Sequence, residues 1–71
     1  MRSVYEVDGY EVAFVPWRSE FLEEDFVAVY VTKDGREVMH SGMTKLEPSD
    51  KTAQDVVDAM LALREAMRDG N

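Results

Sequence analysis

Residues 26–43, FVAVYVTKDGREVMHSGM, constrain the fold more than any other part of this chain. The first seven of them are dense in β-branched and aromatic side chains, which favour a pleated, half-buried surface. Asp34 and Gly35 follow and precede a second apolar run. Asp-Gly in this position is typical of a two-residue hairpin loop, because both loop residues need a positive φ. The segment therefore predicts a β-hairpin.

The loop also predicts which residues of the two strands face each other. The expected pairs are Lys33 with Arg36, Val31 with Val38, Tyr30 with Met39, and Val29 with His40. Side chains alternate between the faces of a strand, so one face would carry Val27, Val29, Val31, Val38 and His40, and the other Phe26, Ala28, Tyr30, Met39 and Met43. Both faces are apolar, whereas a sheet with one wet face has one polar side. Such a sheet needs cover on both faces.

A second Asp-Gly pair, Asp8 and Gly9, separates two shorter strand-like runs, residues 3–7 and 10–15. As a hairpin it would pair Val7 with Tyr10, Tyr5 with Val12, and Glu6 with Glu11. The alternative is one long strand with a bulge at Asp8 and Gly9. We favour the hairpin, and we expect Pro16 to end its second strand, because proline cannot donate to a β-ladder.

Residues 16–25, PWRSEFLEED, form the least regular stretch. Ser19 could cap one helical turn over residues 20–24, with acidic side chains near the favourable end of the helix dipole. Two interpretations of Trp17, Phe21 and Leu22 remain open. They could fold over the sheet edge and close the core, or they could form an exposed acidic and aromatic docking segment.

The C-terminal part predicts one amphipathic helix that begins between Ser49 and Thr52, where a capping residue and a near capping box occur. Arg68 and Gly70 suit its end. Its apolar stripe has i, i+3, i+4 spacing and, apart from Arg64, consists of Ala53, Val56, Val57, Met60, Leu61, Leu63 and Met67. The whole chain is then a single α+β domain: an antiparallel sheet of three or four strands, followed by a helix packed on one face.

Size and charge narrow the possible functions. A chain of 71 residues buries a marginal core, and without cysteine it has no disulfide to stabilise it, so oligomerisation is a plausible stabiliser. The net charge of −7 repels phosphate backbones and anionic membranes. The first residues lack the apolar core of a signal peptide, and no apolar run approaches the length of a membrane span. We expect a cytoplasmic protein that does not bind nucleic acid directly.

Residues that could support catalysis are few. His40 is the one histidine, and Ser41 beside it would point to the opposite face of a strand. The acidic run at residues 23–25 lacks the alternating ligands and central glycine of a calcium loop. The four glycines do not form a phosphate-binding loop. We expect neither an enzyme nor a cofactor or metal site.

The order strand, strand, strand, helix resembles the N-terminal domain of HicB-type antitoxins. The similar parts are YEVAFVP, FVAVYV and the helix rich in Ala, Val and Leu, within residues 10–67. The resemblance implies an oligomer that assembles around a small toxin. The Pro-Asp-Leu-Pro-Gly segment of that family is absent here, so topology is what the two share.

The expected function follows from the imbalance between two apolar sheet faces and one helix. An apolar face left open predicts a protein-interaction module that self-associates as a homodimer. The expected contact residues are Phe26, Tyr30, Met39, Met43, Trp17, Phe21 and Leu22. The monomeric alternative is a curled sheet covered by the 16–25 stretch. The alternative function is an acidic regulator, antitoxin-like or a nucleic-acid mimic, that neutralises a basic partner acting on nucleic acid.

Overall fold

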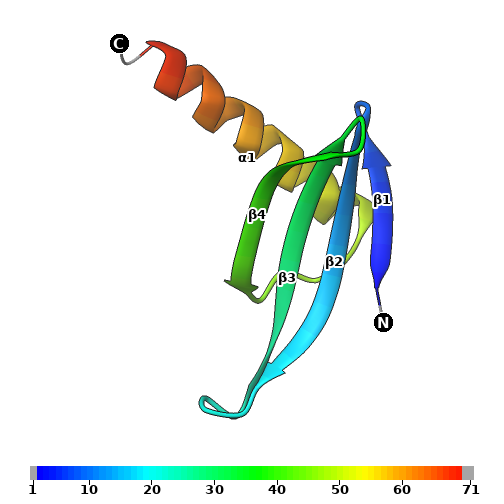
Figure 1. Cartoon of the computed structure of the whole chain (residues 1–71), viewed down its shortest axis with the longest axis vertical. Helices are drawn as coiled ribbons and strands as arrows, with labels where there is room; N and C mark the ends of the chain where they lie inside the picture. The colour runs from blue at the N-terminus through cyan, green and yellow to red at the C-terminus, as the bar shows by residue number, and fades with distance from the viewer. Residues whose placement is uncertain (1, 70–71) are drawn as a thin grey trace.

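A computed structural model describes residues 2–69 as a four-stranded antiparallel sheet followed by one helix. The strands are β1 (Ser3–Val7), β2 (Tyr10–Ser19), β3 (Glu24–Lys33) and β4 (Arg36–Thr44), and they lie in the sheet in chain order. The helix α1 (Asp50–Asp69) crosses one face (Figure 1). The predicted α+β class is confirmed.

Both Asp-Gly pairs form the predicted hairpin turns. Asp8 and Gly9 have φ values of 50° and 85°, and Asp34 and Gly35 have 51° and 79°. These are left-handed conformations, which glycine adopts freely and aspartate more readily than most residues. The register of the first hairpin is also as predicted, with Val7 opposite Tyr10. The alternative of one bulged strand is therefore wrong.

The register of the second hairpin differs from the prediction beyond its first pair. Lys33 faces Arg36 as expected, but a bulge at Val38 shifts the pairs of Val31, Tyr30 and Val29 by one residue, and a second irregularity between Val29 and Val27 shifts the Val27–Thr44 pair by one more. The observed pairs are Val31 with Met39, Tyr30 with His40, and Val29 with Ser41. A shift of one residue exchanges the faces of a strand, so His40 and Met39 lie on the faces opposite to those predicted.

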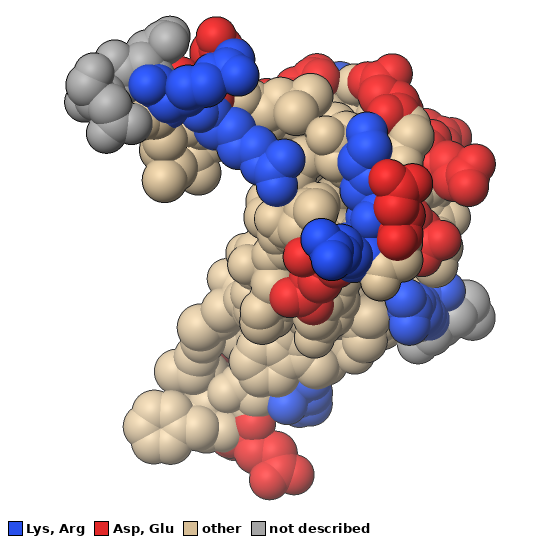
Figure 2. Space-filling view, turned by 45° about the horizontal axis from the view of Figure 1, so that its top comes forward, with Lys and Arg blue, Asp and Glu red and all other residues tan. Residues whose placement is uncertain are grey.

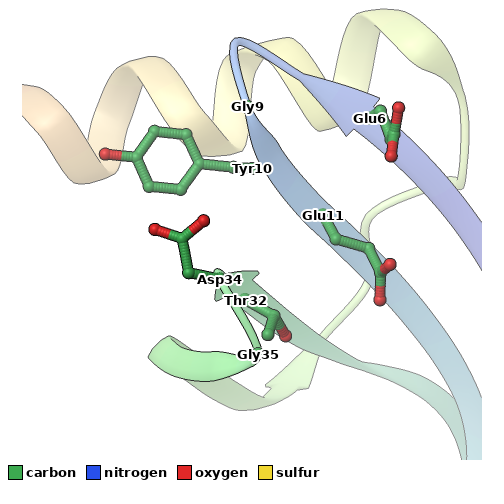
Figure 3. Close-up of a pocket in the computed structure, with 7 residues that line it drawn as sticks. All are labelled: Glu6, Gly9, Tyr10, Glu11, Thr32, Asp34 and Gly35. Carbon is green, nitrogen blue, oxygen red and sulfur yellow. The ribbon is translucent and has the colours of Figure 1, made fainter.

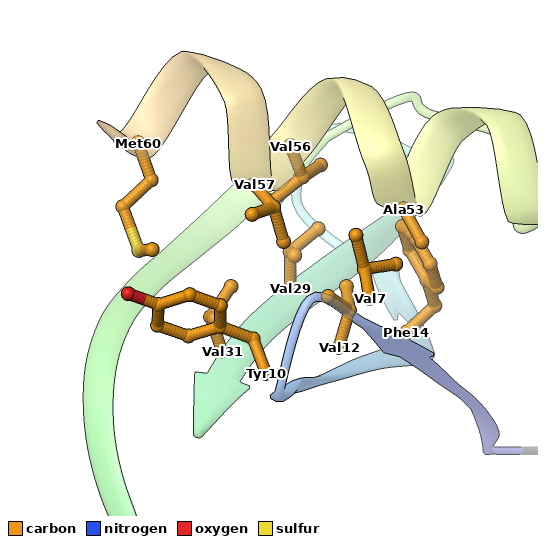
Figure 4. Close-up of a cluster of buried hydrophobic side chains, with 10 residues drawn as sticks. All are labelled: Val7, Tyr10, Val12, Phe14, Val29, Val31, Ala53, Val56, Val57 and Met60. Carbon is orange, nitrogen blue, oxygen red and sulfur yellow. The ribbon is translucent and has the colours of Figure 1, made fainter. Parts of the chain in front are cut away.

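The face beneath α1 holds the core. Two rows of paired residues cross it, Tyr5–Val12–Val31–Met39 and Ser3–Phe14–Val29–Ser41. The helix contributes the first part of its apolar stripe, Ala53, Val56, Val57 and Met60, all buried (Figure 4). Val38 and Met39 pack against this cluster, because the bulge turns both toward the helix. We call this side of the sheet the covered face.

The helix starts where the sequence predicted. The Ser49 hydroxyl accepts a hydrogen bond of 3.0 Å from the Thr52 amide, which satisfies one unpaired N–H of the first turn. The end of the stripe is different, because Leu61, Leu63 and Met67 are 40%, 63% and 67% exposed. Figure 1 shows the cause: the second half of α1 extends past the edge of the sheet. The predicted C′ glycine, Gly70, lies outside the described residues.

The 16–25 stretch corrects two expectations. Pro16 does not end a strand, since β2 continues to Ser19 and pairs Pro16 with Val27. Because β1 stops at Ser3, opposite Phe14, β2 has a free edge beyond that point, where a missing N–H is tolerated. The expected helical turn is instead a tight loop between β2 and β3. The two strands form an arm that extends beyond the rest of the sheet (Figure 1).

Candidate interaction surface

The face of the sheet turned away from α1 is the candidate site, and we call it the open face. Among residues 2–69 no helix or strand covers it. Its paired rows are Glu6–Glu11–Thr32–Glu37, Val4–Ala13–Tyr30–His40, Val15–Ala28 and Trp17–Phe26. The first row, near the Asp-Gly turns, is acidic. The other rows, toward the arm, are apolar and aromatic.

Large side chains on this face close over small ones. Ala13 and Ala28 are only 1% and 7% exposed, although nothing packs above them from another element. Their neighbours Val4 and Trp17 are 47% and 37% exposed. Burial of the alanines beneath half-exposed larger groups produces a continuous apolar surface. Such surfaces on a small protein mark interaction sites.

Two aromatic stacks fix the shape of the open face. Trp17 and Phe26 stack with ring centroids 5.3 Å apart, and the Trp17 indole N–H donates a 2.9 Å hydrogen bond to the Gly42 carbonyl. Tyr30 and His40 stack almost in parallel, 4.8 Å apart. Offset stacking of this kind is favourable beyond the area it buries. The stacks therefore hold these rings in fixed positions on the open face.

His40 differs from its expected role. The sequence placed His40 on the face with Val29 and Val31, but the bulge at Val38 leaves it exposed on the open face against Tyr30. Ser41 points to the covered face, as its pairing with Val29 shows. The two side chains thus lie on opposite faces, as predicted, and cannot act as a nucleophile and base pair.

A cation lies at the arm end of this surface. The Lys45 ammonium is 5.2 Å from the centroid of the Phe26 ring and 2.6 Å from a Glu24 carboxylate oxygen. Both partners of this ion pair are at least half exposed, so the pair adds little to stability. The pair itself is neutral, whereas the row near the turns carries three glutamates.

The tip of the arm carries an exposed aromatic side chain. Phe21 is 94% exposed, and Leu22 beside it is 41% exposed. The Ser19 hydroxyl accepts a 3.2 Å hydrogen bond from the Leu22 amide, and Glu23 adopts a left-handed φ of 54° to close the loop. The interpretation that Phe21 folds over the sheet edge is wrong. The two strands hold it away from the core.

An acidic pocket of about 280 Å³ lies between the two Asp-Gly turns. Figure 3 shows Glu6 and Glu11 on the adjacent strands β1 and β2, with Asp34 in the β3–β4 turn. Tyr10, Thr32 and the two turn glycines complete the lining. Within residues 2–69, no three His, Cys, Asp or Glu side chains are placed to hold a metal ion. The pocket contributes negative charge and presents no nucleophile paired with a base.

A second depression, about 270 Å³, lies between α1 and the segment that precedes it. Its lining is Leu46, Thr52, Asp55, Val56 and Ala59. It lies on one flank of α1.

The predicted contact residues divide into three groups. The open face brings together Phe26, Tyr30 and Trp17, and Met43 lies, 56% exposed, in the irregular part of β4 between the Val29–Ser41 and Val27–Thr44 pairs. Phe21 and Leu22 lie on the arm tip. Met39 is on the covered face and packs against the core, so its assignment to the open face is wrong.

Sequence reasoning missed Val4, Val15 and His40 as members of the open face. Val4 and Val15 could have been found by extending the alternation of the first hairpin across the sheet. His40 could not have been found in this way, because its face depends on the bulge at Val38. Val38 and Met39 are both apolar, so no polar residue marks the bulge.

Comparisons with known proteins give no relative: no family model, curated protein or solved structure matches the chain. Within residues 2–69, no helix is both long enough and apolar enough to cross a membrane.

Proposed function

We propose that this protein is a small, non-enzymatic protein-interaction module that self-associates as a homodimer through its open face. The observation that carries the proposal is the apolar, aromatic surface of β2, β3 and β4, which lies opposite the helix and is braced by the Trp17–Phe26 and Tyr30–His40 stacks. A second copy of the chain is a partner of matching size and apolar character, and a two-fold axis would join the same patch on both copies.

Charge favours one orientation of that second copy. If the strands of the two open faces ran in the same direction, the Glu6–Glu11–Glu37 rows of both copies would come together. Like charges at close range disfavour such a contact. An antiparallel arrangement separates the two acidic rows and brings each toward the end of the partner's open face that carries Lys45.

The test is the substitution Tyr30→Glu, in the middle of the open face. We expect the wild-type protein to show twice its 8.1 kDa chain mass by light scattering, in low salt and at 1 M salt, because apolar contacts survive screening. Tyr30→Glu should be folded by circular dichroism and have the mass of one chain. The matched control is Ala62→Glu, an exposed position on α1, which should remain a dimer.

Two outcomes would contradict the proposal. A wild-type protein that is monomeric at all concentrations has no self-association to explain. A Tyr30→Glu variant that is folded and still dimeric would place the interface elsewhere.

The acidic row supports a second candidate, a regulator that neutralises a basic protein acting on nucleic acid. Three glutamates in one row beside an acidic pocket give the turn end of the sheet a concentrated negative field. Binding of a basic partner at this end would weaken steeply as salt rises, because the screening length falls to about 3 Å at 1 M. The sheet-face dimer should not show this dependence.

A further inference from the structure

Parts of the sheet have a backbone edge that no neighbouring strand pairs with. β1 and β4 form its two sides, and β2 becomes an edge beyond Phe14, because β1 begins at Ser3 opposite that residue. Within residues 2–69, no other strand pairs with β2 on that side. The N–H and C=O groups of an edge strand can pair with a strand of another chain, so a small sheet needs features that prevent this pairing.

Most of these edges carry features that are common at the edges of natural sheets. β1 is only five residues long, and two register shifts interrupt β4. β3 is free only from Glu24 to Phe26, because β4 ends at Thr44 opposite Val27, and its first two residues are acidic. Short strands, bulges and charged side chains all oppose the addition of another strand. The free edge of β2 has none of the first two features.

The free edge of β2, residues 15–19, exposes the backbone groups of Pro16 and Arg18. Val7 and Tyr10 close a two-residue loop, and the residues of such a closing pair exchange backbone hydrogen bonds. Alternate residues of a strand point their N–H and C=O groups to the same side. From Tyr10, every second residue of β2 therefore points toward the side of β1. Pro16 and Arg18 do so beyond the end of β1.

The pairing on the other side of β2 agrees with this direction. Pro16 lies opposite Val27 in β3, and a proline is tolerated in a ladder only where no N–H is needed. Its neighbours Val15 and Trp17 then supply the hydrogen bonds to β3. Pro16 thus leaves the β2–β3 ladder intact and removes a donor from the free edge alone.

The residues around Pro16 would otherwise favour pairing with another chain. Phe14, Val15 and Trp17 are uncharged and have high β-propensity. Such a run on an exposed edge tends to pair with other copies unless a charge or a proline interrupts it. Figure 2 shows the arm as a largely tan projection, so charge does not protect most of its length. Proline is the feature that interrupts the run.

We propose that the 15–19 edge of the arm is a strand-pairing surface for the same edge of a second copy, and that Pro16 blocks it. An added strand finds no donor at position 16 and meets the proline ring instead. Arg18 opposes pairing less, since Asp25 lies 3.2 Å from its guanidinium and offsets the charge. Two such edges can pair antiparallel about a two-fold axis, so a copy of the chain is the matching partner. The inference concerns the sheet edge and does not depend on the open-face homodimer.

The experiment restores the missing N–H with Pro16→Val in the Tyr30→Glu background, which removes association through the open face. Pro16 is exposed and valine favours a strand, so the variant should be folded by circular dichroism. Light scattering should give twice the mass of the Tyr30→Glu variant. In the wild-type background, Pro16→Val should give species larger than those of the wild type.

Two further variants in the same background are the controls. Pro48→Val makes the same change in the connector before α1, at an exposed position outside the sheet, and should not raise the mass. Pro16→Val with Arg18→Pro moves the proline to the next position that faces the edge. This variant should return to the mass of Tyr30→Glu alone.

Amide hydrogen exchange tests the direction of the backbone groups in the wild-type protein. The Arg18 amide should exchange at least about tenfold faster than the Trp17 amide, because the Trp17 amide pairs with β3 and the Arg18 amide faces solvent. In the associated Pro16→Val variant the Arg18 amide should become as protected as that of Trp17. If Pro16→Val fails to fold, the wild-type exchange rates decide.

Several outcomes would overturn the inference. A Pro16→Val variant with the mass of its background at all concentrations would show that the edge stays unpaired without the proline. Equal association of Pro48→Val would make added apolar surface the cause, and association that persists with Arg18→Pro would exclude the edge. A protected Arg18 amide in the wild type would contradict its direction. If Tyr30→Glu itself stays dimeric, the open-face proposal fails, and a doubling of mass by Pro16→Val still supports the edge.

Discussion

The covered and open faces of the sheet are built from similar residues but differ in what completes them. Phe14 and Val31 on the covered face are fully buried by the first half of α1. On the open face, Trp17 and Tyr30 keep part of their surface in solvent and are braced by stacking on Phe26 and His40. Apolar composition therefore does not decide which face is core. The position of one helix decides it.

The helix repeats this contrast along its own length. Val57 is fully buried and Leu63, on the next turns, is 63% exposed, although the apolar spacing continues through both. The difference comes from the extent of the sheet, which ends before the helix does (Figure 1). The same pattern of residues is thus core in one half of α1 and accessible surface in the other.

The three phenylalanines test the contrast between faces most strongly. Phe14→Ala should lower the free energy of unfolding by about 3–5 kcal/mol, because it empties the covered core. Phe26→Ala should cost about 2–3 kcal/mol, because Phe26 is only 7% exposed and stacks on Trp17, although it lies outside the cluster beneath α1. Phe21→Ala, on the arm tip, should change it by no more than about 0.5 kcal/mol. Urea unfolding at one low protein concentration measures all three, and an equal loss for Phe14 and Phe26 would erase the distinction between the faces.

The two halves of α1 are compared by Val57→Ala and Leu63→Ala. Val57→Ala should destabilise the fold by about 2 kcal/mol, since its methyl groups are buried against the sheet. Leu63→Ala should alter stability by less than about 0.5 kcal/mol. Thermal unfolding of the dilute proteins gives both values. A large loss from Leu63→Ala would mean that the helix end packs within its own chain.

A smaller effect is expected at the start of the helix. Ser49→Ala removes the acceptor for the Thr52 amide and should cost about 1 kcal/mol. Ser49→Asp keeps a side-chain acceptor and serves as the control. Helix content and unfolding free energy can be measured together by circular dichroism. If Ser49→Ala were neutral, the start of α1 would be fixed by packing of Ala53 and Val56 alone.

Local features explain why much of the fold could be predicted. The Asp-Gly turns depend on backbone conformations that few other residue pairs adopt, and the cap at Ser49 depends on one hydrogen bond within four residues. Pro16 was misread because its tolerance depends on where β1 ends, which is not a property of the residues around it. The prediction missed the arm for the same reason, since a strand that stops at Pro16 cannot carry Phe21 away from the sheet.

Part of the candidate site could also be predicted, because strand alternation is a local feature. Phe26 and Tyr30 follow from the strand alternation predicted for the second hairpin, and Trp17 was named as a large side chain of the irregular 16–25 stretch. Met39, His40 and Met43 depend on two register shifts that no polar residue marks. The sequence by itself determined the two hairpins, the start of the helix and the presence of more apolar surface than one helix can cover. Tertiary structure alone decided which face is covered, where the helix leaves the sheet and which way Phe21 points. Those outcomes depend on the relative lengths of strands and helix, and on contacts between residues far apart in the chain, which local propensities do not encode.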